Sequence, residues 1–191
     1  MDWRPFRQNR NFRLLVVGQL FSLLGSNVTM VAVPYQVYSQ THSSLWVGLA
    51  SLVQLPPLIL GSLWGGAYGD RFDRRRLLII GSFLAAATSG ALALNAALSR
   101  HDLTVVLLLA ALAAGAAGFS GPVRQAALPT MLRDDQLVSA YSLYQIVVNI
   151  SIVAGPSLAG VLLASVSLSS CYLVDALTFV VLTSLQASRS R

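Results

Sequence analysis

The chain has 191 residues, a formal net charge of +6 and a hydrophobic content of 55%, while only 10% of its residues are charged. Soluble domains typically carry about 25% charged residues, so this composition excludes an ordinary soluble enzyme or binding module. The single cysteine, Cys171, excludes an intrachain disulfide. The positive charge is gathered in a few short segments, and this placement argues against nucleic acid as the partner.

Long uncharged runs predict the architecture. Asp, Glu, Lys and Arg are all missing between Leu14 and Gly69, and again between Leu77 and Ser99. A helix needs about 20 apolar residues to cross a bilayer, and its backbone groups must be satisfied within the segment. The runs are too long for the strands of a membrane barrel. We therefore predict an all-α membrane protein with six spans, at about residues 12–38, 45–69, 77–98, 103–121, 138–165 and 168–186.

The placement of arginine predicts the orientation. All basic residues are arginine, and 12 of the 13 lie in residues 4–13, 71–76, 124–133 and 189–191. These segments alternate with turns that carry almost no charge, which is typical of the positive-inside rule. Six spans would then place both termini in the cytoplasm. The first apolar run is too long for the core of a signal peptide, so we interpret it as a retained span.

The turn between the second and third spans is the most informative segment. Residues 66–78 read Gly-Ala-Tyr-Gly-Asp-Arg-Phe-Asp-Arg-Arg-Arg-Leu-Leu. This segment resembles motif A of the major facilitator superfamily, Gly-x-x-x-Asp-Arg-x-Gly-Arg-Arg-x-x-Leu, with Asp73 in place of the second Gly. The resemblance implies a conformational latch built from Gly66, Asp70, Arg71, Arg74 and Arg75.

A latch of this kind has a physical basis. A carboxylate at a helix end can accept hydrogen bonds from the positive N-terminus of a neighbouring helix. Arginine can hold another helix end by paired hydrogen bonds. Contacts that form in only one conformation bias a two-state equilibrium. The alternative is that these arginines only set the topology.

A second segment lies on the fifth span. Gly155, Pro156 and Gly160 resemble motif C, the Gly-Pro-x-x-Gly-Gly signature of antiporters in the same superfamily, with Ala159 replacing one Gly. A Gly-Pro pair bends a helix and narrows its profile. The resemblance implies that this face packs against an opposite bundle and limits leakage. Residues 6–19, 31–48 and 122–129 are similar to the branch of proton-coupled drug antiporters that includes enterobactin-exporter-like and macrolide-efflux-like proteins.

Small and polar residues predict contacts between helices. Gly61, Gly65 and Gly69 recur every four residues on the second span, so they share one face that another helix can approach closely. Asn27 and Thr29 lie in the middle of the first span and could form hydrogen bonds across helices.

Polar residues inside spans are costly and therefore candidates for function. Asp175 is the only acidic residue deep within a predicted span. It could accept a proton, bind a cationic group of a substrate or make a structural hydrogen bond. The resemblance implies that Asn27, Gln36 and Asn149 line a central cavity. Arg124 is expected at the cytoplasmic mouth, where it anchors the fourth span or meets an acidic partner.

The sequence does not indicate an enzyme. Ser120 lies in a Gly-x-Ser-Gly pattern similar to that of rhomboid proteases, but both histidines, His42 and His101, lie in outward turns, away from this serine. A serine nucleophile needs a base within reach. No phosphate-binding loop is present, and we predict neither a metal nor a cofactor. Short cytoplasmic loops argue against the membrane domain of an ATP-driven exporter.

The resemblance implies that residues 1–191 form the N-terminal six-helix bundle of a major facilitator fold, built from two inverted units of three spans. Its implied function is proton-coupled export of a small hydrophobic drug or siderophore-like molecule by alternating access, in a bacterial cell membrane. The expected partners are the bilayer, the small molecule, protons, and either a C-terminal bundle or a second half-transporter copy. The second bundle is absent from this chain, so we expect no transport by the isolated chain. The alternative is a membrane interaction or assembly protein without transport activity.

Overall fold

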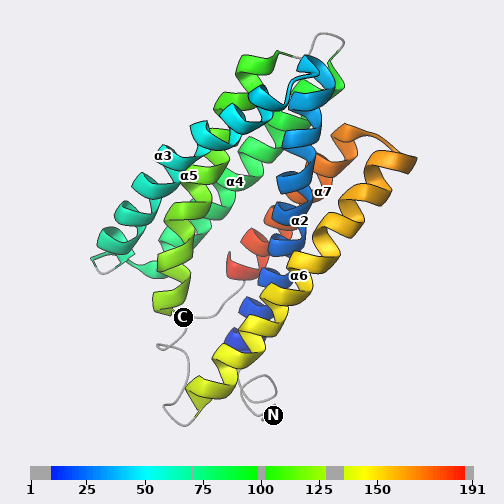
Figure 1. Cartoon of the computed structure of the whole chain (residues 1–191). Coiled ribbons are helices and arrows are strands. Elements are labelled where there is room, and N and C mark those ends of the chain that lie inside the picture. The colour runs from blue at the N-terminus through cyan, green and yellow to red at the C-terminus, as the bar shows by residue number, and fades with distance from the viewer. Residues whose placement is uncertain (1–9, 70, 99–101, 128–135, 188–191) are drawn as a thin grey trace.

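Six long helices make up the computed structural model, which describes residues 10–69, 71–98, 102–127 and 136–187 (Figure 1). These residues contain no strand, so the all-α prediction is confirmed. Helices α2 to α6 are long and apolar enough to cross a membrane, whereas the apolar part of α7, Leu168–Ser184, is shorter. The helices are α2 (Arg10–Thr41), α3 (Ser44–Gly69), α4 (Arg74–Ala97), α5 (Leu103–Ala127), α6 (Leu137–Ser165) and α7 (Leu168–Ala187).

Local chemistry sets where two of these helices begin and end. Helix α4 begins ahead of the predicted span because Asp73 caps it with an extended backbone, φ −60° and ψ 107°. The Asp73 carboxylate accepts a hydrogen bond of 2.9 Å from the backbone N–H of Arg75, and aspartate is among the preferred N-cap residues. Helix α5 continues past Gly121 and through Pro122 to Ala127. Membrane helices tolerate such a proline because neighbouring groups satisfy the freed carbonyl.

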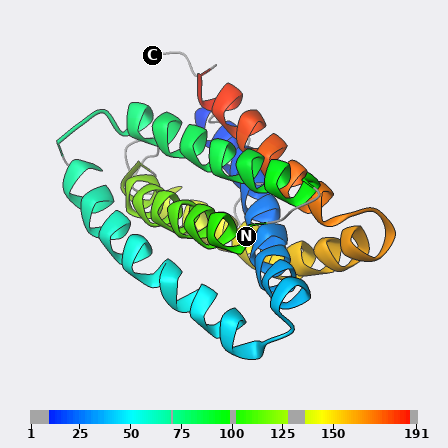
Figure 2. The ribbon, with the colours of Figure 1, turned by 90° about the horizontal axis from the view of Figure 1, so that it is seen from above.

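The packing of the helices follows an internal repeat. The main contacts are α3 with α5, α2 with α6, α4 with α5, α2 with α7, and α4 with α7. Figure 2 shows α5 lying between α3 and α4. Exchanging α2 with α5, α3 with α6 and α4 with α7 turns each contact in this set into a contact of the same set, and α4 with α7 is turned into itself. A unit of three spans reverses its direction across the membrane, so this pattern is the one expected of an inverted repeat.

Close approach between α3 and α5 depends on glycine. A Cβ atom at Gly61 would overlap the carbonyl of Gly115, and one at Gly65 would overlap the carbonyl of Phe119. From the other side, a Cβ at Gly118 would overlap the carbonyl of Leu58. The spacing of four therefore predicted a contact that is confirmed, and the structure identifies the partner helix as α5.

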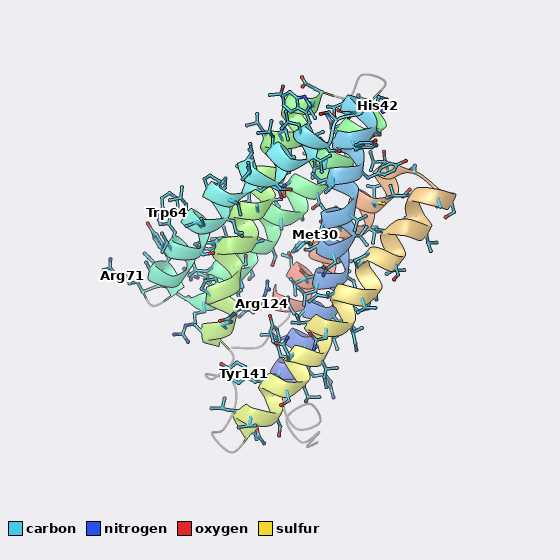
Figure 3. The ribbon with its side chains drawn as sticks, in the orientation of Figure 1. Met30, His42, Trp64, Arg71, Arg124 and Tyr141 are labelled. Carbon is cyan, nitrogen blue, oxygen red and sulfur yellow. The ribbon has the colours of Figure 1, made fainter. Side chains whose placement is uncertain are left out.

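The outer side of α3 carries tryptophans near both of its ends. Trp46 and Trp64 are 41% and 62% exposed, and Figure 3 shows Trp64 on the side of α3 that faces away from the bundle. Eighteen helical residues rise by about 27 Å, close to the hydrocarbon thickness of about 30 Å. Tryptophan favours both membrane interfaces, so this pair fits a membrane-spanning α3.

The apolar core differs between the two ends of the bundle. We call the end that carries the α3–α4 turn and the first residues of α4, residues 71–76, the arginine end. At the opposite end, one cluster joins residues of all six helices, among them Val37, Leu92, Val106 and Tyr172. At the arginine end the core divides into two separate clusters. One joins α2 and α6 through Phe12, Leu15, Val16, Ala140 and Leu143, and the other joins α4 and α5 through Leu77, Leu78, Val123 and Ala127.

Figure 1 shows the same divergence, with α2 and α6 leaving α4 and α5 toward the arginine end. Helices α2 and α6 are thus joined most firmly to α4 and α5 at the opposite end of the bundle.

The α3–α5 contact yields a prediction about stability. Gly65→Ala should lower the free energy of unfolding by about 1–3 kcal/mol, because overpacking a tight contact forces the backbones apart. Gly48→Ala is the matched control on the same helix, since nothing lies within 4 Å of a Cβ built there. Thermal and SDS-induced unfolding in detergent micelles would compare the two variants. Equal stability of the two variants would contradict the contact.

Candidate functional site

The only acidic residue described within the helices, Asp175, lies where α7 meets α2 and α4. Its side chain is buried, with 2% exposure. Atom Oδ2 accepts two hydrogen bonds of 2.7 Å, one from the Thr29 hydroxyl on α2 and one from the Ser89 hydroxyl on α4. Three helices from both halves of the repeat therefore meet at one carboxyl group, and the possibility that Thr29 bonds across helices is confirmed.

The second oxygen of this carboxyl group is unusual. Asp175 Oδ1 is buried and has no hydrogen-bond partner in the described part of the chain. It lies against Gly25 of α2, where a Cβ atom would come within 2.6 Å of it. Such a Cβ would also meet the Thr178 hydroxyl. Glycine at position 25 therefore allows α2 to lie directly on the carboxyl group.

A second polar layer lies one turn away on α7. The Tyr172 hydroxyl donates a hydrogen bond of 2.7 Å to Gln36 Oε1 on α2, and Gln36 Nε2 donates to Asn95 Oδ1 on α4 at 3.4 Å. All three side chains are buried. The same three helices are thus joined twice, and Gln36 belongs to this layer between helices. The expectation that Gln36 lines a cavity stays a prediction.

Arg74 connects three helix ends at the motif A turn. Its Nε donates to the Gly69 carbonyl of α3 at 3.1 Å, and its Nη1 donates to the Ala126 carbonyl of α5 at 2.5 Å. The last carbonyls of a helix lack partners within that helix, and a cation there also complements the helix dipole. Arg74 therefore holds the C-terminal ends of α3 and α5 at the start of α4.

The other motif A residues differ in their surroundings. Gly66 has open space around a Cβ position, Arg71 is exposed and Arg75 is half-buried in the first turn of α4. Asp70 lies outside the described residues, so its part in the predicted latch is not seen. Asp73, which departs from the motif, caps α4, and its weak ion pair with exposed Arg76 spans 3.9 Å.

The motif C residues point in two directions. Gly155 is buried against α2, where an added Cβ would overlap the Cβ of Asn27. Pro156 and Gly160 lie on an exposed side of α6. Asn27 Nδ2 donates to the Leu23 carbonyl of its own helix at 2.8 Å. Within the bundle, Gly155 therefore makes a close contact with α2 and Ala159 is buried in the apolar core, whereas Pro156 and Gly160 stay uncovered.

Two further candidates lie on the sides of α5 and α6. Asn149 is exposed on α6 and accepts a hydrogen bond of 3.3 Å from Gln145 of the same helix. Arg124 is half-buried near the end of α5. The structure therefore does not gather all the candidates: Asp175 and Gln36 occupy adjacent layers, while Asn149 and Arg124 lie apart from them.

Several partners in these layers had no distinctive signal in the sequence. Ser89, Asn95 and Tyr172 are ordinary polar residues within apolar spans, and only their placement opposite Asp175 and Gln36 shows their importance. Their burial in a membrane span was the available clue, because hydrocarbon offers polar groups no partner. Asp73 did carry a local signal, since an aspartate just before a helix is a typical N-cap.

The Arg74 contacts lead to a second prediction about stability. Arg74→Gln should lower the free energy of unfolding by about 1.5–3 kcal/mol, the usual range for hydrogen bonds to a charged group. Arg76→Gln is the control, because that side chain is 80% exposed and exposed substitutions change stability by about 0.5 kcal/mol at most. Chemical unfolding in micelles would measure both variants, and a loss of stability in Arg76→Gln as large as that in Arg74→Gln would refute the anchoring role.

Comparison with known proteins shows which family this chain resembles. The family model described as "Transmembrane secretion effector" matches residues 1–191. The staphyloferrin A transporter of Staphylococcus aureus is 28% identical over 159 residues, which cover 82% of this chain and 40% of that protein. The enterobactin exporter of Citrobacter koseri is 30% identical over 176 residues, which cover 90% of this chain and 41% of that protein.

A drug efflux protein is similar to the same degree. The multidrug efflux pump Tap of Mycobacterium bovis is 30% identical over 159 residues, which cover 80% of this chain and 38% of the pump. This chain spans about two fifths of the length of the curated relatives that it matches. The match over all 191 residues and the six-helix architecture agree with the motif resemblances. The chain belongs to the transmembrane secretion effector family of the major facilitator superfamily.

Proposed function

We propose that this bundle is half of a proton-coupled exporter of small hydrophobic or siderophore-like molecules in a bacterial cell membrane. Its relatives are named as siderophore transporters and a multidrug efflux pump, which supports export as the activity. The arginine end would face the cytoplasm, because basic residues favour that side. A second six-helix bundle, from the same polypeptide or from a second copy, would complete the carrier.

Alternating access would follow from the architecture. In secondary transporters, two bundles rock around a site near the middle of the membrane. The inverted pattern of helix contacts supports a rigid unit that could move in this way. A motif A latch that includes Asp70 and Arg71 would stabilise one of the two orientations. Asn27 and Asn149 would contribute to the cargo path.

Asp175 would carry the coupling proton, and its burial is the observation on which this proposal rests. An ionised carboxylate deep in a span costs about 2.5–3.5 kcal/mol. The groups that face it from α2 and α4 are Gly25, Thr29 and Ser89, and none of these is a cation. On α7 itself, the neighbouring titratable groups are Cys171 and Tyr172, and the Tyr172 hydroxyl donates a hydrogen bond to Gln36. A proton on Oδ1 would therefore remove the charge while Oδ2 kept both hydrogen bonds.

Loss of that proton would change the packing. A charged Asp175 would need water or a cation, and the close contact with Gly25 leaves room for neither. Deprotonation would thus favour a conformation in which α2, α4 and α7 separate near this point. A group whose protonation states prefer different conformations couples proton movement to the conformational equilibrium. The cargo gradient and the proton gradient would be linked in this way.

Transport by the complete exporter in proteoliposomes tests this role of Asp175. Asp175→Asn should abolish export driven by a proton gradient while leaving exchange of cargo between the two sides nearly intact, because asparagine keeps an oxygen for Thr29 and Ser89 but cannot release a proton. Asp102→Asn serves as control, since Asp102 is exposed and lies at the opposite end. Full proton-driven export by Asp175→Asn would rule out the coupling role. Absence of any export by the wild type would instead favour an assembly protein without transport.

A further inference from the structure

Asp175 lies between two ends of the bundle whose apolar cores differ. Toward the opposite end, one continuous cluster joins all six helices, and it includes Tyr172, one turn from Asp175 on α7. Toward the arginine end, the buried apolar residues divide into a cluster between α2 and α6 and another between α4 and α5. The helices diverge in the same direction (Figure 1). Any loosening of the packing around Asp175 should therefore open toward the arginine end, where the core is already divided.

Buried polar side chains occupy the arginine side of Asp175. Helices α2 and α4 both begin at the arginine end. On α2, Ser22 lies seven residues before Thr29, and on α4, Ser82 lies seven residues before Ser89. Thr29 and Ser89 are the donors to Asp175. Seven residues make nearly two helical turns, so Ser22 and Ser82 share the helix faces of these donors and lie about 10 Å closer to the arginine end. Their exposed fractions are 3% and 2%.

Gln19 extends this polar set by almost one more turn of α2. Its side chain is 1% exposed, and its Nε2 atom is buried without a hydrogen-bond partner among the residues that the structure describes. A buried amide that lacks a partner costs free energy, and an apolar residue would avoid that cost. Water entering from the arginine end would supply the partner. Gln19 is therefore better explained by hydration during function than by packing.

The matching position on α7 is apolar. Helix α7 runs in the opposite direction to α2 and α4, and Leu182 lies seven residues after Asp175. By the same spacing, Leu182 lies on the face of α7 that holds the carboxyl group, on its arginine side. The side chain is 2% exposed. A polar set on α2 and α4 thus lies at the level of one leucine on α7.

We propose that Gln19, Ser22 and Ser82 line the route by which water from the arginine end reaches Asp175, with Leu182 as an apolar gate. This inference rests on the proposed proton coupling by Asp175 and adds the side with which that residue exchanges its proton. As α2, α4 and α7 separate, water enters past Leu182. The O–H bond of the carboxyl group breaks, the proton passes to a water oxygen, and the resulting hydronium ion leaves at the arginine end.

Cysteine accessibility tests the route without a proton gradient. Ser22→Cys and Ser82→Cys are each introduced into the chain that carries Cys171→Ser. Right-side-out and inside-out membrane vesicles are then treated with a membrane-impermeant cationic methanethiosulfonate. Arg76→Cys marks the arginine end and Asp102→Cys marks the opposite end, because both native side chains are exposed.

Ser22→Cys and Ser82→Cys should react only in the vesicles that label Arg76→Cys. The matched buried control is Val106→Cys, since Val106 is 0% exposed within the continuous cluster. Both serine variants should react about tenfold or more faster than this control, because the thiolate is the nucleophile and forms where water reaches it. Reaction no faster than that of Val106→Cys would overturn the proposal, and so would reaction in the vesicles that label Asp102→Cys.

The gate and the amide have their own variants. Leu182→Ala should speed the labelling of Ser22→Cys, and unchanged labelling would contradict the gate. In the complete exporter, Gln19→Leu should slow proton-driven export about fivefold relative to cargo exchange, the effect of one hydrogen bond on a barrier. Gln54→Leu is the control, because Gln54 donates to the Ala50 carbonyl of its own helix α3. Equal effects of the two glutamine variants would contradict the role of Gln19.

The route and the proposed function can fail separately. If Asp175→Asn exports fully with a proton gradient while Ser22→Cys and Ser82→Cys still react from the arginine end, proton coupling by Asp175 fails and the water route stands. If Asp175→Asn abolishes proton-driven export but both cysteines react no faster than the buried control, the route fails and the proposed function stands.

Discussion

Hydrocarbon offers no hydrogen-bonding partner, and this constraint accounts for the polar contacts that join α2, α4 and α7. The Asp175 carboxyl group, the Gln36 amide and the Tyr172 hydroxyl all find partners on neighbouring helices instead of solvent. The resulting two layers join α2, α4 and α7, which come from both units of the repeat. Polar contacts thus join the halves where they are closest, while glycines bring α3 onto α5 and α6 onto α2.

At the arginine end, the polar contacts have a different origin. There, helix termini supply unpaired carbonyls, and Arg74 satisfies two of them at once. The apolar core is divided at this end, so a few polar groups have a large share in holding it together. Arg74 lies in the first turn of α4 and binds the ends of α3 and α5, so it joins helices from both units of the repeat.

Much of the fold could be predicted because hydrophobicity and charge are strongly segregated along the chain. The uncharged runs predict the helices, and the glycine spacing on α3 predicts a close helix contact. Neither pattern could identify α5 as the partner, because partner choice depends on the three-dimensional arrangement. In the candidate site, Asp175 could be predicted because it is an isolated acidic residue in an apolar span. Ser89 and Asn95 could not be predicted. Nothing in the local sequence distinguishes a serine or asparagine that bonds to another helix from one that bonds to its own.

The contact between Gly25 and Asp175 ties together two positions that are 150 residues apart in the chain. A larger residue at position 25 would meet the Thr178 hydroxyl and the Cα of Asp175 as well as the carboxyl group. A smaller side chain at position 175 alone would therefore not make room for it. Evolution should keep position 25 at the smallest residue in every relative whose first and last helices lie this close together.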